Sequence, residues 1–437
     1  MPVFRARVKR LRPAAIIQET NQSAPMDQFA VLTLLACLGY ASEAAQAERL
    51  GRVSADGEAW REVVKLAQQH SVVALLYHRL KPLHLALSGE TADELKQEYL
   101  KQAQRNIRLY HELGILLRRL QEKNTPVIVL KGAYLAEAVY DNIGLRTMGD
   151  IDLLAKNDDL LLIETELLAL GYRPEENNRV VGLRNKHFRY ILPKNGLTIE
   201  VHWALVVPKL PFRIDVRGLW DRAQPVTLAQ APALALSPED LLLHLCLHTA
   251  SNLREVQLRM LCDIGEVLRR NGAKLDWQEI DSLARQWGAL HALYVILRLT
   301  QELLGAAVPV EWLASLRPDS FDERYLELIR RQLFALHIER KAILSPQAAR
   351  LPELKGFNSK LALIRSRILL SREEMATKYP ASANSWRIYL YYPVRLKYLL
   401  GYHGANLWRL VRGDPETRAV AVRKNEVALL NDWLKSG

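Results

Sequence analysis

Signals of β-structure are confined to one central stretch of this 437-residue chain. The run TPVIVLKG at 125–132 is β-branched and ends in glycine, which is typical of a buried strand followed by a turn. The run at 148–156 alternates as a half-buried strand does. Runs at 187–193 and 197–205 flank an Asn-Gly pair at 195–196, a strong indication of a β-hairpin. The chain therefore carries a small sheet near its middle.

Helical patterns occupy both sides of this stretch. Apolar residues recur at helical spacing from Asp27 to about Arg105, and an amphipathic helix is expected at 106–123. From Ser237 the pattern is helical again, opened by an N-cap serine with proline in the first turn. We therefore predict an α+β protein. Its expected parts are a basic flexible arm (1–25), a helical N-terminal region (26–105), a central core (106–225) and a helical C-terminal region (226–437).

Two stretches of the helical regions resemble each other. Residues 59–80 and 276–299 align with Trp60 on Trp277 and Tyr77 on Tyr294. Each predicts a tryptophan-anchored helix that leads into a second helix. Two copies do not predict a solenoid, which needs about three.

Composition limits the class of protein. The three cysteines are far apart and form no CxxC pair, so neither a disulfide framework nor a zinc motif is indicated, and we expect a reducing cytoplasm. The apolar run at 29–40 has 12 residues, short of the roughly 20 that a bilayer span needs. We expect no transmembrane segment.

The net charge of +12 is concentrated at the two ends. Residues 1–12 carry five basic residues and no acidic one, and residues 355–437 carry 15 lysines and arginines against six acidic residues. Such ends bind RNA, an anionic membrane surface or an acidic partner, or are simply solvated. The aromatic, basic stretch at 385–410 fits RNA stacking, a peripheral membrane contact or ordinary helix packing.

The pair Asp150 and Asp152, separated by Ile151, is the main chemical signal. Side chains alternate along a strand, so both carboxylates project from one face. Two such carboxylates repel each other unless a cation lies between them, and oxygen ligands suit Mg²⁺ or Mn²⁺. An Asp-x-Asp pair alone is weak evidence for a metal site, since solvated acids at a strand end give the same pattern.

The surroundings strengthen this interpretation. Upstream, a strand runs into Lys131-Gly132 and then a helix, whose free N–H groups make a ready phosphate site. Downstream, Glu200 on the hairpin offers a third carboxylate. This order of elements is the one that two-metal phosphoryl transfer needs.

The stretch VLKGAYLAEAVYDNIGLRTMGDIDLLA (129–155), with IEVHWAL (199–205), resembles the bacterial nucleotidyltransferase family proteins of the DNA polymerase β-type superfamily. The similarity continues through four further segments: SPEDLLLHLCLHTA (237–250), RMLCDIGEVL (259–268), LDW (275–277) and YYPVRLKYLL (391–400). It implies a DNA polymerase β-like core, a small mixed sheet with flanking helices. By the same resemblance, Asp150, Asp152 and Glu200 are the catalytic acids and the ligands of Mg²⁺ or Mn²⁺.

The resemblance also implies nucleotide-binding residues. Lys131 and Gly132 match the start of the phosphate-binding turn, but Ala133 stands where the broad superfamily carries serine or threonine. Lys131 can supply the missing phosphate contact by its charge. Arg146 either holds phosphates or forms a structural ion pair, and His202 either contacts substrate or is packed.

Three further residues in the C-terminal region have two interpretations, one functional and one as simple packing. His244 and His248 share a helix face and either line the cleft or are packed; zinc binding lacks a third ligand. Asp263 is expected to form a structural ion pair with Arg259, with cleft lining as the second interpretation.

The predicted function is metal-dependent transfer of a nucleoside monophosphate from a nucleoside triphosphate. The acceptor is a hydroxyl or phosphate on an RNA end, a small molecule or a peptide or protein. The alternatives are a catalytically degenerate fold that binds nucleotide or a partner, and a transferase that uses a nucleotide-sugar donor.

Overall fold

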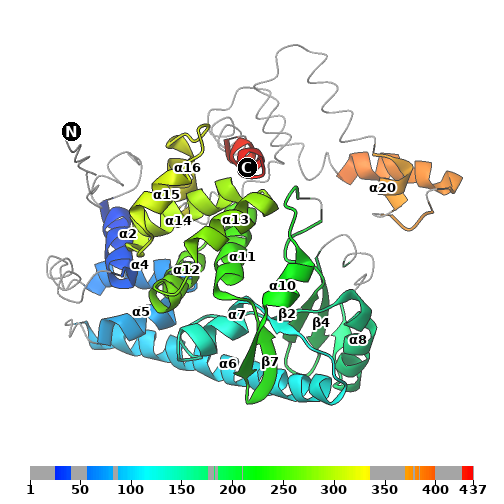
Figure 1. The fold of residues 1–437 in the computed structure, drawn as a ribbon, viewed down its shortest axis with the longest axis horizontal. Coiled ribbons are helices and arrows are strands. Elements are labelled where there is room, and N and C mark those ends of the chain that lie inside the picture. The colour runs from blue at the N-terminus through cyan, green and yellow to red at the C-terminus, as the bar shows by residue number, and fades with distance from the viewer. Residues whose placement is uncertain are drawn as a thin grey trace, which may run out of the picture. The chain divides into compact units, whose positions relative to one another are not determined.

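The computed structural model describes residues 25–40, 57–81, 87–175, 182, 186–208, 210–334, 370–376, 379–382, 384–398 and 426–436. The chain divides into two compact units, one of residues 1–329 with 434–437 and one of residues 330–433 (Figure 1). The predicted basic arm lies outside the described residues except for Pro25. Within the described residues, no helix combines the length and apolarity that crossing a membrane requires.

The first unit is built around a mixed sheet, as the α+β prediction requires. Its strands follow the spatial order β3-β4-β5-β2-β1-β7-β6, with parallel pairing between β2 and β5 and between β1 and β7 and antiparallel pairing elsewhere. The strands are β1 (Ile128–Val129), β2 (Ile151–Leu154), β3 (Arg173–Pro174), β4 (His187–Leu192), β5 (Leu197–His202), β6 (Gln224–Leu228) and β7 (Ala231–Ala235).

The Asn-Gly hairpin is confirmed. β4 and β5 pair from His187 opposite His202 to Leu192 opposite Leu197, and Gly196 in the turn has a φ of +69°, which favours glycine. The expected strand at 125–132 is shorter than predicted, since only Ile128–Val129 pairs before the chain turns into a helix.

One face of the sheet is covered by helices. Figure 1 shows α6 (Gly89–Glu122) running along the sheet with α8 (Leu160–Ala169) beside it. α6 packs against β7 and α8, and the apolar core between them includes Leu113, Leu117, Ile151, Ile163 and Ile199. The short elements around the sheet are α7 (Lys131–Tyr134), the π-helix η2 (Leu135–Val139), η3 (Asn157–Asp159) and α10 (Val216–Arg222).

The helices before and after the core pack together. α2 contacts α4, α5 and α14, while α11, α12 and α14 pack on one another. Tyr40 joins the two groups: its amide donates to Leu304 O at 2.7 Å and its hydroxyl to Cys262 O at 3.0 Å. These helices are α2 (Pro25–Leu38), α4 (Gly57–Gln69), α5 (Val73–Leu80), α11 (Pro238–Ser251), α12 (Leu258–Asn271), α13 (Trp277–Trp287), α14 (Leu290–Leu304), α15 (Val310–Ser315) and α16 (Arg324–Phe334), with the 3-10 turn η4 (Leu253–Glu255).

The two similar sequence stretches form the predicted helix pairs, α4–α5 and α13–α14. Their connections match in detail, because Ser71 and Gly288 occupy the same aligned position and have φ of +57° and +64°. The next amide donates back over the turn in both copies, from Val72 to Ala67 O at 2.9 Å and from residue 289 to residue 284 at 2.8 Å. The repeat is therefore a repeated helix–turn–helix.

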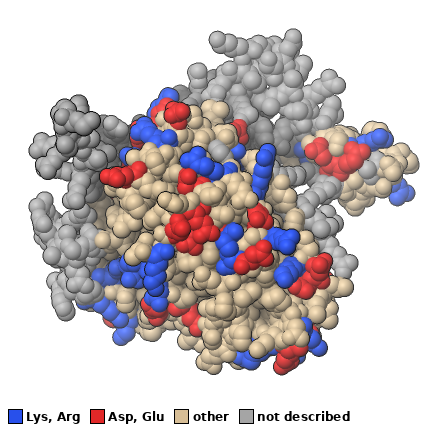
Figure 2. Space-filling model, viewed as in Figure 1, with Lys and Arg blue, Asp and Glu red and all other residues tan. Residues whose placement is uncertain are grey.

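The second unit is described only in short segments. They include α20 (Arg372–Ala376), η5 (Trp386–Leu390) and a helical run at 391–398. Trp386 is 69% exposed and Tyr389 is 56% exposed, while Tyr379 stacks on Tyr391 at 5.1 Å. The rest of the predicted aromatic, basic stretch, 399–410, lies outside the described residues. On the face drawn in Figure 2, basic and acidic side chains of the described residues are interspersed.

Candidate active site

One face of three adjacent strands gathers the predicted acids. β2 and β5 run parallel with Asp152 directly beside Glu200, and β5 and β4 pair with His202 opposite His187. Side chains alternate along a strand, so Glu200 and His202 share a face, and so do Asp152 and Asp150, which directly precedes β2. The register therefore brings together the residues that the sequence predicted as one group.

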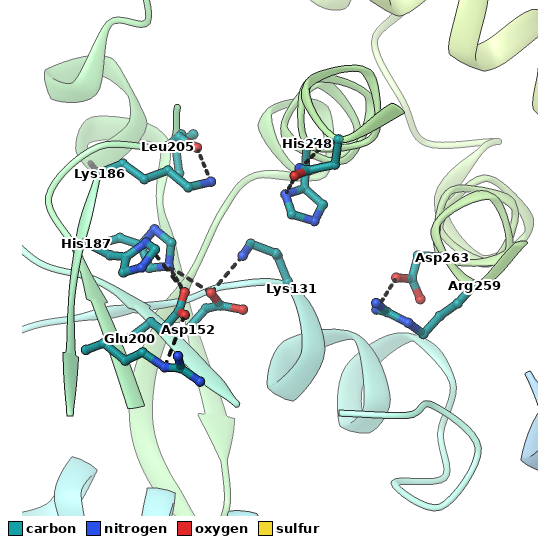
Figure 3. A network of polar contacts seen from close by, with 12 residues as sticks. Lys131, Asp152, Lys186, His187, Glu200, Leu205, His248, Arg259 and Asp263 are labelled. Atoms are coloured by element: carbon teal, nitrogen blue, oxygen red, sulfur yellow. Dashed lines mark hydrogen bonds and ion pairs between the residues drawn. The ribbon is translucent and has the colours of Figure 1, made fainter. Parts of the chain in front are cut away.

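Contact distances in this group are short. His202 Nε2 lies 2.7 Å from Asp152 Oδ1 and 3.4 Å from Glu200 Oε2. His187 Nδ1 lies 3.5 Å from the same Glu200 oxygen, and Lys131 Nζ lies 2.7 Å from Asp152 Oδ1. Figure 3 shows these side chains converging from the strands and from the turn that carries Lys131. Asp152 Oδ1 thus contacts both the Lys131 ammonium group and the His202 imidazole.

Lys131 is held in an unusual backbone conformation. Its φ is +37°, in the left-handed region that residues other than glycine rarely occupy. The preceding amide, Leu130 N, donates to Asp152 O at 2.9 Å and ties the end of β1 to β2. Lys131 is only 8% exposed. Such local strain persists where the surroundings enforce it, often at functional sites.

The carboxylates differ in their ionisation. Burial, with the nearby Asp152 and Glu200 charges, raises the pKa of Asp150 to about 6. Burial opposes ionisation of Asp152 too, but Lys131 and His202 hold its pKa well below the usual range. Burial also opposes ionisation of Glu200, but the hydrogen bond from His202 and the charges of His187 and His202 together lower its pKa. Asp150 is therefore the acid that most lacks a neutralising partner.

Two basic residues on the hairpin side were not predicted. Burial lowers the pKa of Lys186 to about 8, helped by the positive charge of Lys131, and its Nζ donates to Leu205 O at 3.1 Å. Burial also lowers the pKa of His187 to about 4. No local pattern marks either residue, because the pairing of His187 with His202 depends on a four-residue loop at 193–196 that an Asn-Gly pair does not specify.

His244 and His248 on α11 face this group. Burial lowers the pKa of both well below the usual value, and Lys131 and Lys186 lower it further. His244 is 1% exposed, and neither of its ring nitrogens has a hydrogen-bond partner among the described residues. Figure 3 shows His248 across from Lys131 and Lys186. Both histidines are therefore buried near the lysines of this group, and cleft lining stays a prediction.

Arg146 and Asp263 form a second buried charge cluster. Arg146 Nε and Nη2 donate to the two Asp263 oxygens at 3.0 and 2.9 Å, and the Tyr140 hydroxyl donates to Oδ1 at 3.0 Å. Arg259 Nη1, the partner expected from the sequence, is 3.9 Å from Oδ2. A Cβ on Gly132 would lie 2.7 Å from Arg146 Nη1. Of the two roles considered for Arg146, the structure contains the ion pair; phosphate binding stays a prediction.

Further contacts fix the loop before the acid pair. Arg105 on α6 donates to Met148 O at 3.1 Å and to Gly149 O at 2.9 Å. The Thr147 hydroxyl donates to Ser71 O at 3.0 Å, in the turn between α4 and α5. The N-terminal helices therefore help to position the acids. No motif in the sequence indicated these contacts.

The donor set suits a divalent cation. Asp150, Asp152 and Glu200 offer carboxylate oxygens, which Mg²⁺ and Mn²⁺ prefer. Among the described residues, ligand atoms of His187, Glu200 and His202 lie within 4.8 Å of one another. The uncompensated Asp150 carboxylate and the shared Glu200 are the features that a cation would stabilise.

Comparisons with known proteins identify the family of the chain. No curated protein matches the chain. Among solved structures, the antibiotic-resistance factor ANT(2'')-Ia, solved in solution, matches with a TM-score of 0.32 and 15% identity over 44% of this chain and 96% of that chain. A family model described as uncharacterised nucleotidyltransferase matches residues 56–305. The chain thus belongs to this family of uncharacterised nucleotidyltransferases.

Proposed function

We propose that this nucleotidyltransferase has a DNA polymerase β-like core and is metal-dependent. Asp150, Asp152 and Glu200 would hold one or more divalent cations, Mg²⁺ or Mn²⁺. The observation that carries the proposal is the parallel register of β2 and β5, which sets Asp152 beside Glu200 with Asp150 on the same face. Three carboxylates this close repel one another, and only partial compensation comes from Lys131 and the histidines.

When bound, the metal would supply charge neutralisation at the phosphates and a Lewis acid for the reacting oxygens. The protein's own cations would bind the rest of the triphosphate. Lys131 is buried and Lys186 half-buried beside the carboxylates, and both point toward the same space in Figure 3. Lys131 is the first residue of α7, and we assign it the phosphate contact that Ala133 cannot make through a hydroxyl. A buried lysine is a strong point charge for phosphate.

The reaction is attack of an acceptor oxygen on the α-phosphorus of a nucleoside triphosphate. A new P–O bond forms to the acceptor, the bond between the α-phosphorus and the bridging oxygen breaks, and pyrophosphate leaves. The acceptor proton goes to a carboxylate of the group.

Other predicted residues receive positioning roles. Arg146 holds the loop before the acids through Asp263 and lies against Gly132 in the phosphate turn. His202 donates to Asp152 and orients that carboxylate toward the cation. His202 Nδ1 has no hydrogen-bond partner among the described residues, so a substrate contact by its other nitrogen is part of the proposal.

The test uses purified protein, Mg²⁺ or Mn²⁺, and each α-labelled nucleoside triphosphate in turn. Total RNA, small metabolites and host proteins are offered as separate acceptors, because the acceptor class is open. Label entering one pool with wild type and with Asp158→Asn, an exposed acid outside the group, but not with Asp152→Asn, supports the proposal. Tight metal-dependent nucleotide binding without label in any pool would instead support a binding protein or a nucleotide-sugar donor.

A further inference from the structure

His187, Glu200 and His202 are a metal-ligand set of a different kind from the aspartate pair. Two imidazoles and one carboxylate come from the adjacent antiparallel strands β4 and β5, where His187 and His202 are direct partners. Their ligand atoms lie within 4.8 Å of one another. Pairing between two long strands fixes this geometry better than a loop would.

The spacing already matches that of a bound ion. His187 Nδ1 and His202 Nε2 lie 3.5 and 3.4 Å from Glu200 Oε2. Bonds of about 2.1 Å in a tetrahedral zinc site separate two ligand atoms by about 3.4 Å. These two separations therefore fit a bound ion, and the two nitrogens lie within 4.8 Å of each other. The ring centroids of the two histidines are 4.9 Å apart, with the rings tilted by 50°.

Unused polar atoms point the same way. His187 Nδ1 is buried and makes no hydrogen bond among the described residues, although it faces Glu200. Buried polar atoms in native proteins normally have a partner, so a bound ligand would explain this one. When an ion binds, His202 Nε2 gives up its hydrogen bond to Asp152 Oδ1, 2.7 Å away, and the ring proton moves to Nδ1, which has no partner among the described residues. The freed Asp152 oxygen can then act as a fourth ligand.

We infer that His187, Glu200 and His202 form a nitrogen-containing cation site that takes a borderline first-row ion such as Zn²⁺ or Co²⁺ in preference to Mg²⁺. Imidazole ligands suit these ions, whereas Mg²⁺ prefers oxygen and keeps its water. The inference goes beyond the proposed function, because binding of this ion is measurable whether or not nucleotidyl transfer is found. The site lies beside the aspartate pair and shares Glu200 with it.

The experiment is a Co²⁺ titration of the full chain followed by visible absorption, with Zn²⁺ and Mg²⁺ as competitors. We expect one Co²⁺ per chain, with d–d absorption bands typical of a low coordination number. Zn²⁺ should displace this Co²⁺, and the same concentration of Mg²⁺ should not. His187→Ala should weaken binding at least about 100-fold, more than the 10–100-fold typical of outer-shell changes. His111→Ala, which removes an exposed histidine on α6, is the matched control and should bind like wild type.

Two results would overturn the inference: wild type that binds Co²⁺ and Zn²⁺ no better than Mg²⁺, or folded His187→Ala that binds them as wild type does. If His187→Ala does not fold, X-ray absorption on Zn²⁺-loaded wild type decides. Two imidazoles per zinc support the site, and a shell without imidazole rejects it. Asp150→Asn separates this inference from the proposed function, since it should lose Mg²⁺-dependent transfer and keep the cobalt bands.

Discussion

Two buried charge clusters lie on either side of the turn that begins at Lys131, and they are built differently. In the Arg146–Asp263 cluster, one guanidinium meets one carboxylate through two hydrogen bonds, and Tyr140 adds a third. The charges of the Arg146 guanidinium and the Asp263 carboxylate cancel, and the contact between them is bidentate. This is the arrangement expected of a structural pair.

The cluster on the strands is not balanced in this way. Asp150, Asp152 and Glu200 stand together, and the pKa of Asp150 is raised to about 6 because burial and its acidic neighbours disfavour its charge. His187 and His202 each keep a ring nitrogen without a hydrogen bond among the described residues. A protein tolerates such a site when a ligand completes it, so the contrast supports our proposal that the chemistry takes place at the strands and that Arg146–Asp263 is structural.

The largest expected effect is on activity at the strand cluster. Asp152→Asn should lower the transfer rate by about 1,000-fold or more, since electrostatic stabilisation and metal binding each contribute several kcal/mol. The fold should persist, because the amide still accepts from Lys131. Single-turnover transfer and the circular dichroism melting curve measure both. Activity above one tenth of wild type would show that this carboxylate is not at the reaction centre.

The matching change in the other cluster should act on stability. Asp263→Asn leaves the buried Arg146 without its counter-charge, which costs about 3–5 kcal/mol in the free energy of unfolding. Urea denaturation measures this cost. Glu98→Gln, which removes an exposed pair with Lys101 on α6, serves as the control and should cost about 0–1 kcal/mol. An equally small loss for Asp263→Asn would contradict the structural role.

Lys131→Met should affect both transfer activity and stability, because Lys131 belongs to the strand cluster and its charge also compensates that of Asp152. We expect about 100-fold weaker transfer, the usual cost of one lost charge-stabilising donor. The melting temperature should fall in the absence of metal, and Mg²⁺ should restore more of it than in wild type by replacing the lysine charge. Lys101→Met, at an exposed position, should change neither property. A Mg²⁺ response equal to that of wild type would speak against a cation at Asp152.

The smallest expected effect is on the pH dependence of stability. The pKa of His244 and His248 is lowered from 6.5 by burial and the nearby lysines, so the unfolded chain binds more protons than the folded one below pH 6.5. Stability should therefore decline as pH falls through about 6.5 and further below. His244→Gln should flatten this slope in unfolding experiments between pH 7 and 5. An unchanged slope would mean that His244 is protonated in the folded state.

Part of this arrangement is readable from the sequence. Alternation along a strand set Asp150 and Asp152 on one face, and the Asn-Gly turn fixed the hairpin that carries Glu200 and His202. Both signals are local, but they do not fix the register. Leu192 pairs with Leu197, so the loop has four residues (193–196), whereas a two-residue Asn-Gly turn would have set His187 opposite residue 204 instead of His202.

The remainder depends on contacts between distant segments. Local spacing offered Arg259 as the partner of Asp263, but Arg146, 117 residues away, has the better geometry. Strand β7, APALA, lacks the β-branched alternation that predicts strands and forms only because β1 and β6 pair with it. The contacts of Arg105 likewise arise only when α6 packs beside the loop.

The central claim is that the strand cluster, and not Arg146–Asp263, holds the metal and the nucleotide. A crystal structure with Mn²⁺ and a non-hydrolysable nucleoside triphosphate tests this most directly through the anomalous signal of manganese. The account predicts a manganese peak about 2.2 Å from oxygens of Asp150 and Asp152, with the phosphates beside Lys131. A nucleotide bound elsewhere, with no manganese at these aspartates and the Lys131–Asp152 pair intact, would contradict it.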